Sequence, residues 1–220
     1  MSVDREKVNE EEKMKISQDI IKEEIGEMKE RYTKLEGLFK EKEEILKRDS
    51  ITATINEFLD IKKSRKYPDL EYKYPELKTY SDKTIYMFSV TKIPYKKEDV
   101  DKIFKEETPK SANGKKISLC RINDSDKWKN VNSNETACLY VGSSEEIHKR
   151  LKEHLFECEP TTYAMHLDTW FEKKDLPITI NIWDFSEFLK DEKSDTDYLQ
   201  TIEDLLWNHY KPLFGRQGKK

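Results

Sequence analysis

The sequence lacks several features that mark common classes of protein. It has only three cysteines in 220 residues (Cys120, Cys138 and Cys158), an odd number with neither a CxxC pair nor a Cys/His ligand spacing. This favours free thiols in a reducing compartment over disulfides or zinc. No run approaches the ~18 apolar residues that span a membrane. The N-terminus lacks the basic and apolar regions of a signal peptide, so we expect a cytoplasmic protein without membrane contact.

The motifs of several enzyme classes are missing as well. There is no phosphate loop, no HExxH, no dinucleotide-binding glycine fingerprint and no nucleophile elbow. The formal charge of −4, from 41 Lys and Arg against 45 Asp and Glu, does not by itself indicate a nucleic-acid binder. Nucleic-acid binding requires only a local basic surface, however, and the charge therefore leaves that function open.

The N-terminal region, residues 1–65, is expected to be helical. Residues 4–48 contain no proline and read as one long helix whose apolar residues recur every three or four positions, the period of a coiled coil. This seam consists of Ile21, Ile25, Met28, Tyr32, Leu35, Phe39 and Leu46. Either it forms a coiled coil in a homodimer, or the helix folds back on its own domain. A second helix is expected over Thr52–Ser64.

After an expected extended linker at 66–82, the pattern changes to that of a mixed domain at 83–220. Strands are expected at 85–90, 137–142 and 178–182, and helices at 144–157, 161–173 and 195–210. The expected fold class is α+β, with a small three-stranded antiparallel sheet flanked by helices. An insertion at 91–136 carries 11 Lys and Arg against 8 Asp and Glu, and it is expected to include a strand around 116–122.

The sharpest local feature begins at Leu139 and runs to Glu146. A strand is expected to end at Gly142, and Ser143 and Glu146 have the spacing of a capping box, so a helix should begin there. On this helix Arg150 and His154 lie one turn apart, and we expect them to face the same cleft as Tyr140. Taken singly, each of these side chains is more common in a structural role than in a functional one.

Taken together, four elements resemble the GIY-YIG nuclease family, over residues 84–217. Ile85-Tyr86 corresponds to the GIY element and Tyr140-Val141-Gly142 to the YIG element. Lys149-Arg150-Leu151, with His154, is similar to the helix that carries the family's arginine. Glu203, ahead of Lys211-Pro212, stands where the family keeps a metal-binding glutamate. The departures are Thr84 for the glycine of GIY, Ser143 where many members have a basic residue, 53 residues between Tyr86 and Tyr140, and Gly215 for the usual asparagine.

The resemblance implies a metal-dependent DNA endonuclease of restriction, phage or mobile-element type. Glu203 would hold one Mg²⁺ or Mn²⁺ ion, and Arg150 would bind the phosphate oxygens. Tyr140 would be the general base, with Tyr86 assisting, if positive charge lowers a phenol pKa from about 10. His154 would bind the phosphate or orient a tyrosine.

Four basic residues are expected to contact DNA: Lys115, Lys116, Lys149 and Arg216. Two alternatives to an active nuclease stay open. One is a GIY-YIG domain that has lost activity and serves as a DNA-binding or assembly module. The other is a coiled-coil interaction protein in which the α+β domain has no catalytic role.

Overall fold

The computed structural model describes residues 3–63, 70–80, 82–92, 95–105, 110, 114–130, 135–156, 161–172, 174–192 and 195–217. The side chains of residues 3–21, 24, 62, 129–130 and 195–197 are outside this description. Parts of the expected linker (66–69 and 81) and of the insertion also lie outside it. The chain divides into two compact units, Met1–Ile45 and Leu46–Lys220.

The first unit is one long helix, α1 (Val3–Lys42), followed by the short 3₁₀ helix η1 (Glu43–Ile45). The helix ends earlier than the expected residue 48. Along the apolar seam, Ile25, Met28 and Tyr32 are 46%, 49% and 36% exposed, whereas the side chain of Ile21 lies outside the described residues. The coiled coil therefore stays a prediction. No helix in the described part of the chain combines the length and apolar character that crossing a bilayer requires.

The second unit contains a four-stranded antiparallel sheet in the order β1-β4-β2-β3. Its strands are β1 (Lys47–Thr54), β2 (Thr84–Val90), β3 (Ala137–Ser144) and β4 (Pro177–Asp184). The α+β class is as expected, and the three strands expected from the sequence are all present. The expected number of strands is wrong, because β1 adds a fourth.

β1 occupies a stretch that was expected to contain the end of one helix and the start of the next. It pairs only with β4, so it is an edge strand, and its inward-facing apolar residues are Ile51 and Ala53. The alternation of buried and exposed residues in β1 is short, and it is hard to recognise in the sequence because charged residues precede it (Lys47, Arg48 and Asp49). Charged residues are usual on the edge strands of sheets. The sheet unit therefore begins at Leu46, ahead of the boundary expected near residue 83.

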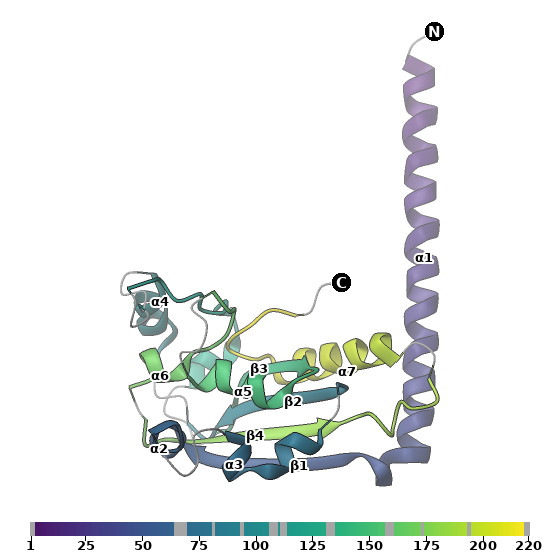
Figure 1. The fold of residues 1–220 in the computed structure, drawn as a ribbon. Helices are drawn as coiled ribbons and strands as arrows, with labels where there is room; N and C mark the ends of the chain where they lie inside the picture. Colours follow the sequence, from purple (N-terminus) through teal and green to yellow (C-terminus); the bar gives the residue numbers. More distant parts are fainter. Residues whose placement is uncertain are drawn as a thin grey trace. The chain divides into compact units, whose positions relative to one another are not determined.

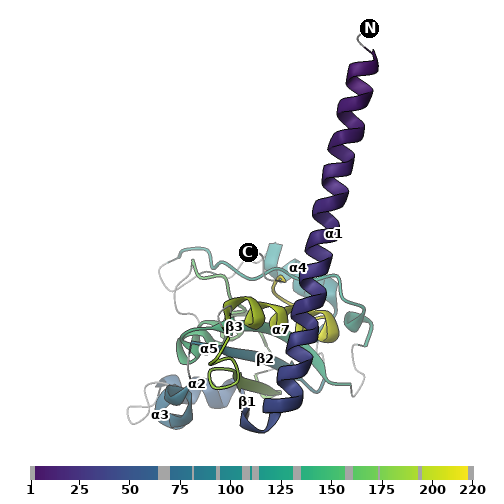
Figure 2. The same ribbon diagram turned by 90° about the vertical axis from the view of Figure 1, so that its right-hand side faces the viewer.

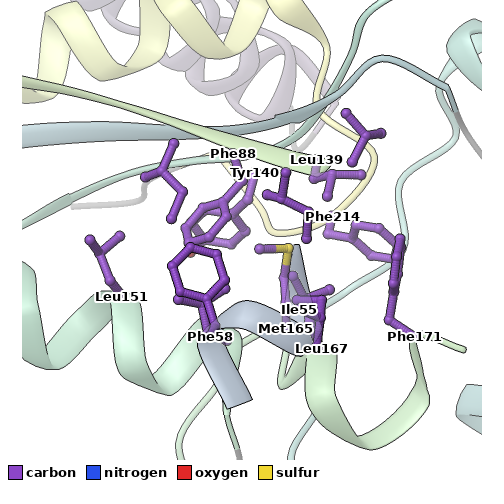
Figure 3. Packing of buried hydrophobic residues seen from close by; sticks show 14 of the residues in the cluster. Ile55, Phe58, Phe88, Leu139, Tyr140, Leu151, Met165, Leu167, Phe171 and Phe214 are labelled. Carbon is purple, nitrogen blue, oxygen red and sulfur yellow. The ribbon is translucent and has the colours of Figure 1, made fainter. Parts of the chain in front are cut away.

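The central strand β2 is buried along its whole length, and its two faces pack differently. Tyr86 and Phe88 face the main core, where they lie beside Ile180 and Ile182 of β4. Figure 3 shows this core below the strands, with Phe58 of α2 (Ile55–Lys63) and Leu151 of α5 (Ile147–Leu155) packed in it. The yellow helix α7 (Asp195–Tyr210) lies across the other face of the sheet (Figures 1 and 3), where it packs on β3.

Helices and 3₁₀ turns complete the second unit: α3 (Leu70–Lys73), η2 (Pro75–Thr79), α4 (Lys97–Lys105), η3 (Asp126–Asn130), α5 (Ile147–Leu155), α6 (Leu167–Trp170) and α7 (Asp195–Tyr210). α7 has the expected bounds. The other two expected helices are shorter than predicted, α5 beginning at Ile147 and α6 covering only four residues. In place of the strand expected at 116–122, the insertion forms isolated bridges, such as Leu119 with Ala164 and Ile122 with Phe214.

The insertion is anchored to the second unit through aromatic side chains. Phe104 of α4 and Trp128 of η3 both pack on Phe214, with ring centroids 6.0 and 5.7 Å apart. Phe214 in turn pairs with β3, since its N–H donates to the carbonyl of Leu139 over 2.9 Å. Through Phe214, the insertion is therefore connected to the strand that carries Tyr140. Figure 2 shows the same sheet and α7 from the side.

Candidate active site

Two tyrosines come together where β2 and β3 pair. Tyr86 lies opposite Gly142 and Phe88 lies opposite Tyr140, so both tyrosines project from the same face of the sheet, on a diagonal. Their rings stack with centroids 6.0 Å apart and an interplanar angle of 7°. The register between β2 and β3 shifts directly after this pair, between Phe88 and Ser89, and such irregularities are frequent beside functional sites.

Two glycines make this close approach possible. A Cβ on Gly142 would lie 2.8 Å from the Tyr86 hydroxyl and 2.8 Å from the Tyr140 ring. A Cβ on Gly215 would lie 2.7 Å from the other edge of the Tyr140 ring, and Gly215 also has a φ of +96°. An asparagine at position 215 would therefore overlap Tyr140 as the ring is placed here. Glycine at position 215, where the GIY-YIG pattern has asparagine, therefore leaves room for the Tyr140 ring.

Arg150 on α5 links the two tyrosines to the surrounding chain. Its Nε donates to the Tyr86 hydroxyl oxygen (3.2 Å) and its Nη2 to that of Tyr140 (3.5 Å). The guanidinium also donates to the carbonyl of Tyr163 (2.9 Å) and to Glu153 (2.7 Å). The planar fork is therefore fixed by four acceptors. Glu153 thus engages Nη1 of the guanidinium.

His154, the other predicted residue on α5, is fully buried. Its Nδ1 accepts a hydrogen bond from the N–H of Met165 (3.2 Å), so in the neutral ring Nε2 carries the proton. Nε2 lies 3.0 Å from the Tyr86 hydroxyl oxygen and donates to it. Burial lowers the pKa of His154 well below its ordinary value, and Arg150 adds to the effect. This geometry favours the predicted role in orienting a tyrosine over the role in binding a phosphate.

Glu203 reaches the site from α7, on the other face of the sheet. It is 7% exposed, and its carboxylate accepts hydrogen bonds from the side chain and the backbone of Ser143 at the end of β3. β3 is an edge strand, and Glu203 contacts it at Ser143, three residues after Tyr140. Burial raises the pKa of Glu203, and Arg150 opposes that shift, which shows that the two groups interact.

The predicted capping box at the start of α5 is wrong. α5 begins after Glu146 without a side-chain cap, because β3 continues to Ser144 and Ser143 is engaged by Glu203. Ser143 therefore belongs to the site, whereas the sequence pattern predicted that it caps α5. Glu153 and Tyr163, which hold Arg150, were also missed. No local motif marks either of them, since their contacts depend on how the chain folds.

Both tyrosines have perturbed proton affinities. Burial raises the pKa of Tyr86 well above its ordinary value, and the nearby Tyr140 adds to this, whereas Arg150 lowers it. Burial also raises the pKa of Tyr140, again against the opposing effect of Arg150. Arg150 alone therefore does not supply the positive charge that a phenolate requires. Tyr140, which is 8% exposed against 0% for Tyr86, is the more accessible of the two as a proton acceptor.

The site opens to solvent through a cavity of about 270 Å³. Its lining residues are Ser144, Glu145, Glu146, Lys149, Arg150 and Glu153. Three carboxylates face two cationic groups there, and Lys149 is itself paired with Glu146 at 3.4 Å. An acidic entrance suits a divalent cation better than a bare polyanion.

A single metal ion is compatible with this arrangement. Among the described residues, no group of three His, Cys, Asp or Glu side chains is placed to hold a metal. Mg²⁺ keeps several waters, however, and is often bound through one or two carboxylates together with substrate phosphates. Glu203 is a buried carboxyl group whose described hydrogen-bond donors come from Ser143, so it could supply one such ligand in its charged form. A bound cation would favour its charged form.

Of the four residues expected to bind DNA, the structure brings two near the site. Lys149 lines the cavity, and the guanidinium of Arg216 lies 5.5 Å from the ring centroid of Tyr163. Lys115 and Lys116 are exposed in the insertion. Their role in DNA binding stays a prediction.

Comparisons of the chain with protein-family models, with curated proteins and with solved structures give no match. The GIY-YIG resemblance therefore depends on the four motifs and on the geometry described above.

Proposed function

We propose that this protein is a metal-dependent DNA endonuclease with a centre of the GIY-YIG type. The observation that carries the proposal is that Arg150 contacts both Tyr86 and Tyr140, while Glu203 is close enough to interact electrostatically with all three. These residues come from two strands and two helices and are separated by up to 117 positions (203 − 86). A shared guanidinium, two phenols and one carboxylate are a set suited to a phosphodiester.

In this proposal each side chain has one task. Arg150 binds the non-bridging oxygens of the scissile phosphate and exchanges its contact with Glu153 for one with the substrate. Tyr140 accepts the proton of the attacking water. Tyr86 is held by His154 and Arg150 and fixes the position of the Tyr140 ring by stacking. Glu203 would hold Mg²⁺, which supplies charge stabilisation for the leaving oxygen.

The direct test is Mg²⁺-dependent nicking of a supercoiled plasmid. Glu203→Gln removes the charge of the proposed metal ligand, and Asp204→Asn removes one charge from the neighbouring position of α7. We expect Glu203→Gln to abolish nicking and Asp204→Asn to retain it. Arg150→Lys should also abolish nicking, because lysine keeps the charge but loses the planar fork. Near wild-type nicking by Glu203→Gln or Arg150→Lys would refute the assignment.

The second candidate function is an inactive GIY-YIG domain that binds DNA or supports assembly. The raised pKa of both tyrosines favours it, since a phenol that keeps its proton is a poor base. This candidate expects no nicking by the wild-type protein with Mg²⁺ or Mn²⁺, together with retained DNA binding.

A further inference from the structure

Tyr163, beside the proposed site, contacts the guanidinium groups of two arginines and the backbone of a third. The Tyr163 carbonyl accepts a hydrogen bond from Arg150 (2.9 Å), and the Tyr163 hydroxyl accepts one from the backbone N–H of Arg121 (2.6 Å). The guanidinium of Arg216 lies over the Tyr163 ring. The backbone closes the group, because the N–H of Gly215 donates to the carbonyl of Arg121 (2.8 Å). We call Arg121, Arg150, Arg216 and Tyr163 the Tyr163 cluster.

The charge of this cluster is poorly balanced. Arg150 is paired with Glu153 at 2.7 Å, but neither Arg121 nor Arg216 forms an ion pair with a carboxylate of the described residues. Both side chains are exposed. The carboxylate that responds to Arg121, Asp124, is already paired with Lys97 at 2.9 Å. Arg150 and Arg216 both place a positive charge at Tyr163, and a ligand with several negative charges would relieve the repulsion between them.

A groove leads away from the cluster along the insertion. It has a volume of about 480 Å³, and Arg121, Phe104 and Lys105 are among the residues that line it. Two acidic residues, Asp101 and Asp124, line the groove as well. Cys120, another lining residue, is close enough to Tyr140 and Arg150 to interact with both electrostatically. A chain-like ligand bound at Arg150 can therefore continue past Arg121 into this groove.

We infer that Arg121 and Arg216, held by Tyr163, bind the phosphate adjacent to the one at Arg150 in a DNA strand. The inference rests on the proposed function for the phosphate at Arg150. It adds that the protein recognises a phosphodiester chain through consecutive phosphates and not an isolated phosphate group. Arg121 and Arg216 are phosphate-binding residues in this scheme.

The test uses the full chain and a fluorescein-labelled DNA duplex of mixed sequence, with EDTA to prevent cleavage. Fluorescence anisotropy gives the affinity as a function of salt for wild type, Arg121→Gln and Arg216→Gln. The backbone contacts of Arg121 remain in the first variant. Arg48→Gln on β1 is the matched control, an exposed arginine on the opposite edge strand of the sheet.

We expect each test variant to bind more weakly and to lower the slope of log K against log salt by about 0.9, the value for one phosphate contact. Arg48→Gln should keep the wild-type slope. Unchanged slopes in both test variants would overturn the inference.

Plasmid nicking by the same wild-type preparation separates this inference from the proposed function. Lowered slopes without nicking would support the phosphate subsite and refute the hydrolysis. Nicking with unchanged slopes would support the hydrolysis and refute the subsite.

Discussion

Removing the hydroxyl group of Tyr86 should mainly lower the stability of the protein, whereas removing that of Tyr140 should mainly lower its nicking activity. Tyr86→Phe deletes an oxygen that accepts hydrogen bonds from His154 (3.0 Å) and Arg150 (3.2 Å) at a fully buried position. The Nε2–H of His154 then has no acceptor, which costs about 1–3 kcal/mol for a buried donor. Tyr140→Phe loses only the long contact of 3.5 Å, and Arg150 keeps its bond to the Tyr163 carbonyl. Its cost should be about 0.5 kcal/mol, at the low end for a hydrogen bond.

Urea unfolding followed by tryptophan fluorescence measures this difference. All four tryptophans (Trp128, Trp170, Trp183 and Trp207) lie in the second unit, so the signal reports on the sheet and not on α1. Activity should show the opposite order, because Tyr140→Phe removes the proposed proton acceptor and should slow nicking by about 10²–10⁴-fold. Equal destabilisation by the two variants, or a larger loss for Tyr140→Phe, would refute the hydrogen-bond assignment of His154.

Three further predictions concern the metal, the insertion and α1. The raised pKa of Glu203 means that the folded state holds its proton more tightly than the unfolded state, so metal-free stability should fall as pH rises above the ordinary value of 4.5. Thermal unfolding should lose this dependence in Glu203→Gln, and Mg²⁺ should raise the Tm of wild type but not of the variant. Replacing Lys115 and Lys116 by Gln should weaken DNA binding in anisotropy and lower its salt slope by about 0.9 per contact, and an unchanged slope would assign the insertion to packing. Light scattering should show a dimer for the full chain and a monomer after removal of residues 1–42, whereas two monomers would refute the coiled coil.

The parts of the fold that the sequence predicted are those with a regular buried pattern. β2 and β4 carry continuous or alternating apolar residues, and α7 ends shortly before Pro212, so all three were located from the sequence. β1 was missed because an edge strand buries few side chains, in this case Ile51 and Ala53. Its polar residues match a helix end equally well.

The site divides in a similar way. Tyr86, Tyr140, Arg150 and Glu203 could be named because each lies in a short motif on a recognisable strand or helix. Their partners could not be named, because the contact between Arg150 and Tyr163 depends on a loop path that no local pattern describes. The sequence placed Ser143 at a helix cap because of its spacing from Glu146. Its hydrogen bonds to Glu203 could not be predicted, because the two residues are brought together only by the fold.

The pair of glycines around Tyr140 limits how this sequence can change. Alanine at position 142 would require two rings to move together, since its Cβ would meet Tyr86 and Tyr140 at the same distance of 2.8 Å. At position 215, shrinking Tyr140 would remove the overlap but not the backbone strain of a side chain at a φ of +96°. No single substitution elsewhere therefore compensates for a change at either glycine. A chain of this fold with asparagine at the position of Gly215 should therefore differ at several positions at once, including the backbone path after Pro212.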